Sequence, residues 1–257
     1  TASNNTAVGN NAMIANTTGA SNVAVGKNAL GNNTTAALNT AVGAYALENN
    51  TTGASNTAVG LQALQDNTTA SDNVAVGLNA LLQNTTGDLN VAIGALALDA
   101  NTVGDRSVAV GYSALGSQNP ASNADMNNTA VGYNAGGGLT TGIKNTLIGS
   151  VAGDAITTAD NNTAVGFSAL TANTTGASNT AIGKDSLAAN TTASNNIAVG
   201  LGALKDNTTG ATNTAIGSEA LNNNTTASNN TAVGADALYT NTTGAGGTAV
   251  GAASLDA

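Results

Sequence analysis

The chain of 257 residues contains no cysteine, no histidine and no tryptophan, and it has a single proline. Without cysteine, neither a disulfide framework nor a thiolate metal site can form. Without histidine as well, the usual pairs of nucleophile and general base in enzymes are missing. We therefore expect a protein that is not an enzyme and that carries no cofactor and no metal.

Charged residues are also scarce, at 7% of the chain, and only five of them are Lys or Arg. A net charge of −9 argues against binding to nucleic acid, which requires clustered basic side chains. No apolar run approaches the ~20 residues of a membrane-spanning helix. Low charge favours assembly, because little repulsion keeps copies apart. The chain starts at Thr1 without an initiator methionine, so Thr1 follows either a processing site, which favours export, or the boundary of an expressed segment.

What the chain has in abundance is a repeat, marked by a glycine that recurs with nearly constant spacing. Every interval is 17 residues except one of 21. The glycines are at positions 9, 26, 43, 60, 77, 94, 111, 132, 149, 166, 183, 200, 217, 234 and 251. A period near twenty is typical of a solenoid.

Each repeat contains a short β-branched segment, such as Thr57-Ala58-Val59 before Gly60. We interpret it as a strand whose Val or Ile side chain points into the core. The alanine then faces outwards and packs against another chain. The glycine turns the chain, with a positive φ or too little space for a Cβ. Two exposed variable residues, an alanine and a second buried column of leucine follow. The core and structural residues predicted from this pattern include Val8, Gly9, Val25, Gly26, Leu30, Val59, Gly60, Leu64, Val165, Gly166 and Leu170.

The rest of each repeat usually reads Asn-Thr-Thr and then Gly or Ala. Stacked at one period, the asparagines predict a ladder of side-chain amides. Fixed columns argue against disorder, and the spacing of Val and Leu does not fit a helix. The sequence thus predicts an all-β protein, a parallel β-solenoid (β-roll) of about fifteen 17-residue coils without helices. We expect one domain over residues 1–257.

Residues 107–161 depart from the pattern. Four extra residues near Pro120 predict a loop that bulges from the solenoid. Gly136 and Gly153 replace leucine in two adjacent coils, and Leu139 and Ile156 stand where asparagine is usual. We interpret this as a repacked core.

Three aromatic residues follow the turn glycines in this region, namely Tyr112, Tyr133 and Phe167. They predict either a surface patch that binds a sugar or a partner, or side chains that cover the repacked core. We favour the second interpretation.

The two ends of the sequence complement each other. The chain opens with the last part of a coil, including Asn4 and Asn5, and closes with the first part of one, including Leu255. Joined at Ala257 and Thr1, they resemble an internal coil. This predicts a head-to-tail contact that builds a filament. The alternative is that the sequence is a section of a longer chain.

The string Asn-Thr-Ala-Val-Gly-x-x-Ala-Leu resembles the head repeats of trimeric autotransporter adhesins (YadA-like heads). It is also similar to repeats of bacterial and phage tail-fibre-like proteins. The resemblance covers all fifteen coils, although the coil here is longer than the usual adhesin repeat. It implies a bacterial cell-surface location and three solenoids packed side by side.

Three functions remain open at this stage. The first is a structural subunit or shaft of an extracellular fibre with an adhesive role, whose partner is another copy of itself in a filament or trimer. The second is an adhesin head or tail-fibre section that binds surface glycans or a cell-surface receptor. The third is ice binding by stacked threonines. Adjacent residues of a strand face opposite sides, so one face would carry a single threonine column, which argues against this function. Many Asn-x-Thr triplets also match the N-glycosylation pattern.

Overall fold

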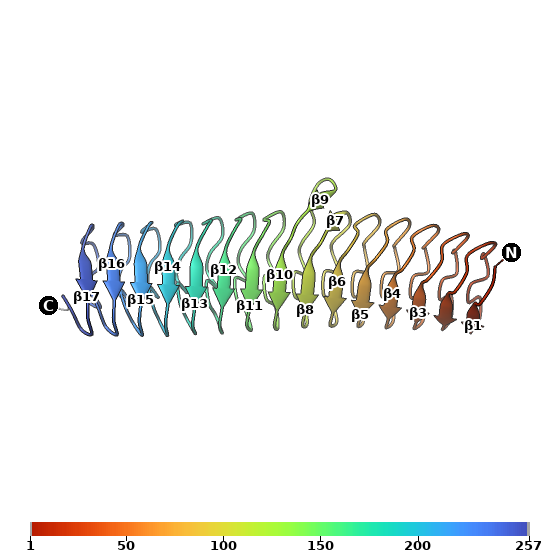
Figure 1. Cartoon of the computed structure of the whole chain (residues 1–257), viewed down its shortest axis with the longest axis horizontal. Coiled ribbons are helices and arrows are strands. Elements are labelled where there is room, and N and C mark those ends of the chain that lie inside the picture. Colours follow the sequence, from red (N-terminus) through yellow and green to blue (C-terminus); the bar gives the residue numbers. More distant parts are fainter. Residues whose placement is uncertain (1, 256–257) are drawn as a thin grey trace. The chain divides into compact units, whose positions relative to one another are not determined.

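The computed structural model describes residues 2–255 and confirms the predicted all-β class. The chain divides into two compact units, residues 1–127 and 128–257, and each unit is a parallel β-solenoid of 17-residue coils (Figure 1). Together the units make about 14 turns. No helix occurs among the residues that the structure describes. The assignment of residues 1–257 to one domain stays a prediction.

Each full coil contributes one strand of three residues. The first unit contains β1 (Thr6–Val8), β2 (Val23–Val25), β3 (Thr40–Val42), β4 (Thr57–Val59), β5 (Val74–Val76), β6 (Val91–Ile93) and β8 (Val108–Val110). It also contains the short strands β7 (Gly104–Asp105) and β9 (Ala124–Asp125). The second unit contains β10 (Thr129–Val131), β11 (Thr146–Ile148), β12 (Thr163–Val165), β13 (Thr180–Ile182), β14 (Ile197–Val199), β15 (Thr214–Ile216), β16 (Thr231–Val233) and β17 (Thr248–Val250).

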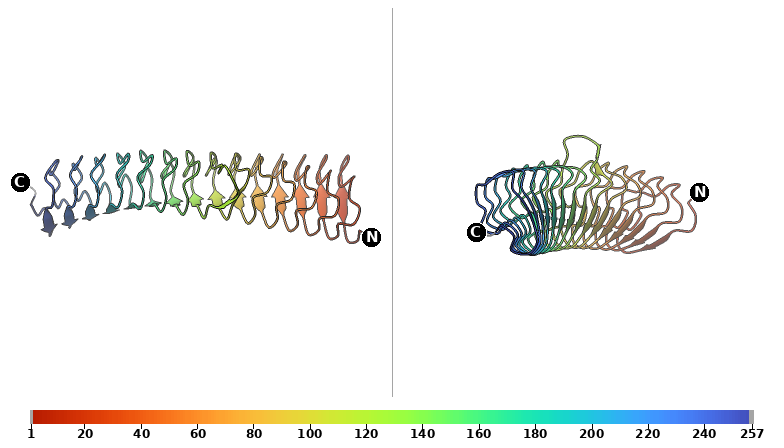
Figure 2. Two further views of the ribbon diagram at one scale, coloured as in Figure 1. Left: turned by 90° about the horizontal axis from the view of Figure 1, so that it is seen from above. Right: turned by 60° about the vertical axis from the view of Figure 1, so that its left-hand side comes forward.

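Successive strands pair in parallel, and equivalent residues of neighbouring coils lie side by side. Ala58 of β4, for example, pairs with Ala75 of β5, which lies 17 residues later. Figure 2 shows that the strands of each unit follow one another along one side of its coils. The repeat in the sequence is therefore also the register of the sheet.

The strand orientation that we predicted from the sequence is wrong. The central alanines of the strands, such as Ala58 and Ala164, are fully buried, whereas the flanking positions are partly or largely exposed. Val8 and Val25 are 58% and 36% exposed. Val59 and Val165 are partly buried. None of the four predicted core valines is a core residue, and the alanine column points inwards instead.

The narrow interior of the coil explains this orientation. Alternate residues of a strand face opposite sides, so either the alanine or both β-branched residues must point inwards. In a representative coil the interior already holds Ala63, Leu64 and the side chain of Asn67, all fully buried. Only a methyl group fits opposite them. The leucine column was predicted correctly, because Leu30, Leu64 and Leu170 are fully buried.

The turn glycines have the two properties predicted for them. At Gly60, φ is +139°, and a Cβ would lie 2.4 Å from the carbonyl oxygen of Gly77 in the next coil. Gly9, Gly26 and Gly166 have φ values of +135°, +142° and +141°. Except at Gly251 in the last coil, a side chain in this column would collide with the backbone of the following coil.

Two asparagine ladders hold neighbouring coils together. In the first, Asn67 is fully buried, and its Nδ2 donates to Oδ1 of Asn50 at 2.8 Å and to the carbonyl of Ala70 at 3.0 Å. In the second, the backbone N–H of Asn56 donates to Oδ1 of Asn39 at 2.8 Å. The predicted ladder of amides is therefore confirmed, and the amides also cap backbone carbonyls within the coil.

The irregular region follows the predicted repacking. Leu139 and Ile156 are fully buried. A Cβ on Gly153 would lie 2.8 Å both from Cδ1 of Ile156 and from Cδ2 of Leu147. The side chains of Ile156 and Leu147 therefore fill the space that leucine occupies in other coils. The inserted residues form the expected loop, which leads to β9 and projects beyond the neighbouring coils of the first unit (Figure 1).

Candidate interaction surfaces

The outward side chains of the strands form what we call the outer strand face. It consists of the first and third residues of the three-residue strands. Among the third residues, Val42 is 37%, Ile93 is 41% and Ile182 is 39% exposed. No three-residue strand contains a charged residue. Each unit thus presents an uncharged surface of β-branched side chains, a kind of surface that commonly marks an interface.

The aromatic residues singled out in the sequence are exposed beside this face. Tyr112 is 50%, Tyr133 is 59% and Phe167 is 53% exposed. Tyr112 belongs to the first unit, and the other two belong to the second. Leu61 and Leu78 precede Tyr112 in the same column and are 46% and 47% exposed. In the first unit the aromatic side chain therefore extends a row of exposed apolar groups.

The other variable positions of the first unit contact one another along the coils. Nζ of Lys27 lies 5.1 Å from the ring centre of Tyr45, and a side-chain hydrogen bond with Tyr45 raises the pKa of Lys27. The carboxylate of Glu48 accepts hydrogen bonds from Nδ2 of Asn28 at 2.8 Å and from Nε2 of Gln65 at 2.7 Å. Each of these polar side chains thus already has a partner within the chain.

The residues proposed for an end-to-end contact are only partly described. Thr1 and Ala257 lie outside the described residues. Asn4 is exposed, and Leu255 is 62% exposed. Asn5 continues an asparagine ladder, because its Oδ1 accepts the backbone N–H of Asn22 at 2.8 Å. The head-to-tail contact stays a prediction.

The first two residues of the Asn-Thr-Thr triplets form hydrogen bonds within the chain. Asn50 is fully buried, and its amide donates to Oδ1 of Asn33 and to the carbonyl of Gly53. A buried asparagine amide can be N-glycosylated only if the coil around it unfolds. The first threonine also bonds within the chain, as Oγ1 of Thr51 donates to the carbonyl of Thr68 at 2.9 Å. Only the second threonine of the triplet, such as Thr52, forms an exposed column.

Within residues 2–255 there is no group of three or more acidic side chains suited to a metal ion. The same part of the chain contains no apolar helix of the length that a membrane crossing requires. No protein-family model and no curated protein matches the chain. The resemblance to adhesin heads and tail-fibre repeats therefore stays a prediction.

A cavity of about 340 Å³ in the second unit, which Gly202 helps to line, was not predicted from the sequence. Gly202 occupies a variable position two residues after a turn glycine, and we predicted only that such positions are exposed. The available signal was the glycine itself, because the equivalent residue of every other coil carries a side chain.

Proposed function

We propose that the chain is a structural subunit of an extracellular fibre or cell-surface filament with an adhesive role. In this proposal, copies of the chain pack laterally through their outer strand faces. The observation that carries it is the exposure of uncharged β-branched side chains on this face in both units. A protein that acts alone gains nothing from leaving Ile93 or Ile182 partly in water, since burial of the remaining apolar surface contributes roughly 25 cal/mol per Å².

The occupant that we propose for the face is a second copy of the chain. All coils but one follow at a 17-residue period, and equivalent strand residues pair throughout each unit, so two copies offer the same column spacing to each other. Neither face carries a charge, and like-charge repulsion therefore does not oppose their contact. Lateral contact through the face replaces the predicted contact through the alanine column, which is buried inside the coil.

The outer strand face extends over all the three-residue strands of each unit. Three strand residues make it about 10 Å wide, and each coil adds ~4.8 Å along the sheet. The seven coils of the first unit then give roughly 300 Å², and the second unit gives about as much again. Each unit thus offers a continuous strip against which a second copy of the chain can pack.

Sedimentation velocity of the purified chain tests lateral packing. We expect the wild-type protein to sediment as an oligomer whose mass is a multiple of 24.5 kDa. The double variant Val42→Lys/Ile93→Lys places two charges on the outer strand face of the first unit and should shift the protein to the monomer. A desolvated lysine without a partner costs several kcal/mol in an interface.

A matched control replaces exposed apolar residues elsewhere in the same unit. Leu38 and Leu89 are 63% and 48% exposed and lie outside the strands. The variant Leu38→Lys/Leu89→Lys should keep the wild-type mass. The proposal fails if the wild-type chain is monomeric at every concentration, or if the strand-face variant assembles like the control.

A further inference from the structure

The cavity around Gly202 results from one missing side chain. Residues Asp185, Gly202 and Glu219 occupy equivalent positions in three successive coils. Gly202 has a φ of +61°, and its φ resembles that of the other residues in this column, such as Asp185 and Glu219 at 57°. The two carboxylate-bearing residues stand two coils apart, at a backbone separation of roughly 10 Å. The gap between them is a recess whose floor is the backbone at Gly202.

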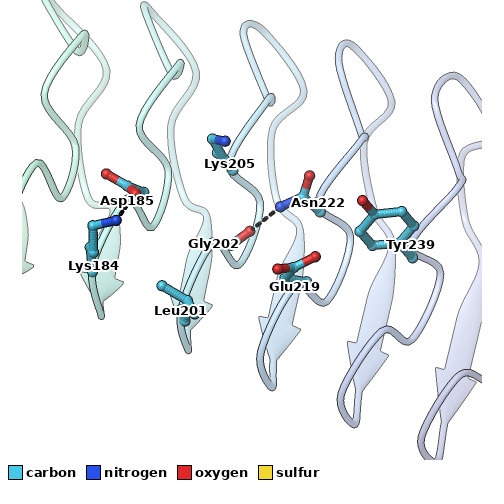
Figure 3. A pocket seen from close by; sticks show the side chains of 8 residues that line it. All are labelled: Lys184, Asp185, Leu201, Gly202, Lys205, Glu219, Asn222 and Tyr239. Carbon is cyan, nitrogen blue, oxygen red and sulfur yellow. Dashed lines mark hydrogen bonds and ion pairs between the residues drawn. The ribbon is translucent and has the colours of Figure 1, made fainter.

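A second column supplies the opposite wall. Lys205, Asn222 and Tyr239 are also equivalent residues of successive coils, and all three line the cavity. Asn222 is only 8% exposed, and its Nδ2 donates to the carbonyl of Gly202 at 2.9 Å. This hydrogen bond fixes the amide beside the recess. Tyr239 is half-buried and presents an aromatic ring at the far coil (Figure 3).

Charge balance narrows the ligand class. The cavity is lined by two lysines and two carboxylates, so their formal charges cancel. Lys184 is already paired with Asp185, at 3.1 Å between Nζ and Oδ2. A phosphate or another strong anion would meet the carboxylate of Glu219, and a cation would meet Lys205. A neutral ligand with many hydrogen-bonding groups suits this lining better than an ion.

We infer that the cavity binds a neutral pyranose sugar, as a residue of a glycan chain. The carboxylate of Glu219 accepts hydrogen bonds from sugar hydroxyls, and the ammonium group of Lys205 donates to them. The C–H face of the ring packs against Tyr239, as apolar surface packs on an aromatic ring. A volume of about 340 Å³ lies at the lower end of the range of small-ligand pockets, roughly 300–1,000 Å³. One sugar ring with part of its neighbour matches this size.

This inference goes beyond the proposed fibre function and does not depend on it. The cavity is formed by residues of one chain within the second unit. A monomer and a fibre would therefore both carry the site. A fibre with one such site per subunit would bind a glycan surface at many points, and multivalent contact makes weak single sites effective.

Saturation-transfer NMR on the full chain tests the sugar site. The probes are methyl α-D-glucopyranoside, methyl α-D-mannopyranoside, methyl β-D-galactopyranoside, N-acetyl-D-glucosamine and L-alanine. We expect saturation transfer to at least one of the sugars and none to the zwitterionic L-alanine. Sugar binding that resists 0.5 M NaCl would agree with a neutral ligand, since salt screens charge pairing.

The decisive variant is Gly202→Asn, which fills the recess. Asparagine tolerates a positive φ, and Asn134 of the same column has φ 51°. A Cβ on Gly202 would meet Nδ2 of Asn222 at 3.1 Å, so this side-chain amide has to shift by only a few tenths of an ångström. The fold should thus be retained, and binding should weaken by at least about tenfold, because a filled recess excludes the ring.

Ser168→Asn is the matched control, because Ser168 lies in the same column with φ 54° but does not line the cavity. It should bind sugars like the wild type.

Tyr239→Leu keeps an apolar side chain at this wall of the cavity but removes the aromatic ring, and it should weaken sugar binding. The inference is overturned if the wild type transfers saturation to no sugar or only to L-alanine. It is also overturned if Gly202→Asn binds as well as Ser168→Asn.

Discussion

At the residue scale, single positions decide how closely two coils approach. The turn glycines recur because the carbonyl of the next coil occupies the place of a Cβ. A related restriction explains part of the alternation of Gly and Ala in the tail of the coil. A Cβ on Gly53 would lie 2.1 Å from the carbonyl oxygen of Ala70 in the following coil. The alternation is visible in the sequence, as at Gly53 and Ala70, but its steric cause is visible only in the structure.

The variant Gly60→Ala should destabilise the first unit by about 3 kcal/mol or more, because it adds a collision to a backbone conformation that costs ~1–3 kcal/mol without glycine. Guanidinium denaturation would measure the loss. Gly31→Ala is the control, since the equivalent residues Glu48 and Gln65 carry side chains. It should change the free energy of unfolding by less than about 1 kcal/mol. Equal effects of the two variants would contradict the account.

Asp99 makes stability depend on pH. Its burial raises the pKa of its carboxyl group and outweighs the hydrogen bonds from the N–H groups of Asp99 and Ala100. Between the ordinary pKa of about 3.9 and this raised pKa, the folded state binds more protons than the unfolded state. Its contribution to stability is therefore full below the ordinary pKa and is lost as the pH rises through the raised pKa.

The variant Asp99→Asn removes the titrating group. It should raise the melting temperature above that of the wild type at pH 7, and the gap should narrow as the pH falls towards 4. Calorimetry over this pH range measures the gap. Asp72→Asn changes an exposed carboxylate of the same unit and is the control. A gap for Asp99→Asn that stays constant with pH would refute the assignment.

At the scale of the element, each coil is a strand of three residues closed by ladders of asparagine. The sequence was sufficient to predict the period, the strand, the turn glycine, the leucine column and the amide ladder. It was not sufficient to predict which side of the strand faces inwards. Alternation in Thr57-Ala58-Val59 reveals two faces but not which of them is buried. Hydrophobicity pointed to valine, while the space left by Leu64 and Asn67 selects alanine.

The ladder should contribute more stability than any exposed amide. Asn67→Ala removes two donated hydrogen bonds and leaves one N–H of the Asn84 amide without an acceptor, while the same nitrogen keeps its bond to the carbonyl of Gly87. We expect a loss of about 2–4 kcal/mol, since an unsatisfied buried polar group costs ~1–3 kcal/mol in addition to lost bonds. Denaturant unfolding measures it. Asn32→Ala removes one exposed bond and should cost under about 1 kcal/mol. If both variants lose the same stability, the ladder is not the main link between coils.

At the scale of the whole molecule, the interior of each unit consists mainly of small side chains, leucine and paired amides, while the β-branched side chains of the strands lie outside. This arrangement is the reverse of an ordinary globular core and is the reason that we expect the chain to assemble. The sugar site depends on the absence of a side chain at Gly202. The sequence alone could not predict this site, because it does not show that residues two and five positions after the turn glycines line the same surface.

Electron microscopy of the purified chain at low and high concentration tests whether its copies assemble through the outer strand face. The account predicts filaments or laterally associated particles at high concentration that disappear in the Val42→Lys/Ile93→Lys variant. Dispersed single chains at both concentrations, with no change in the variant, would contradict a fibre subunit whose copies pack through the outer strand face.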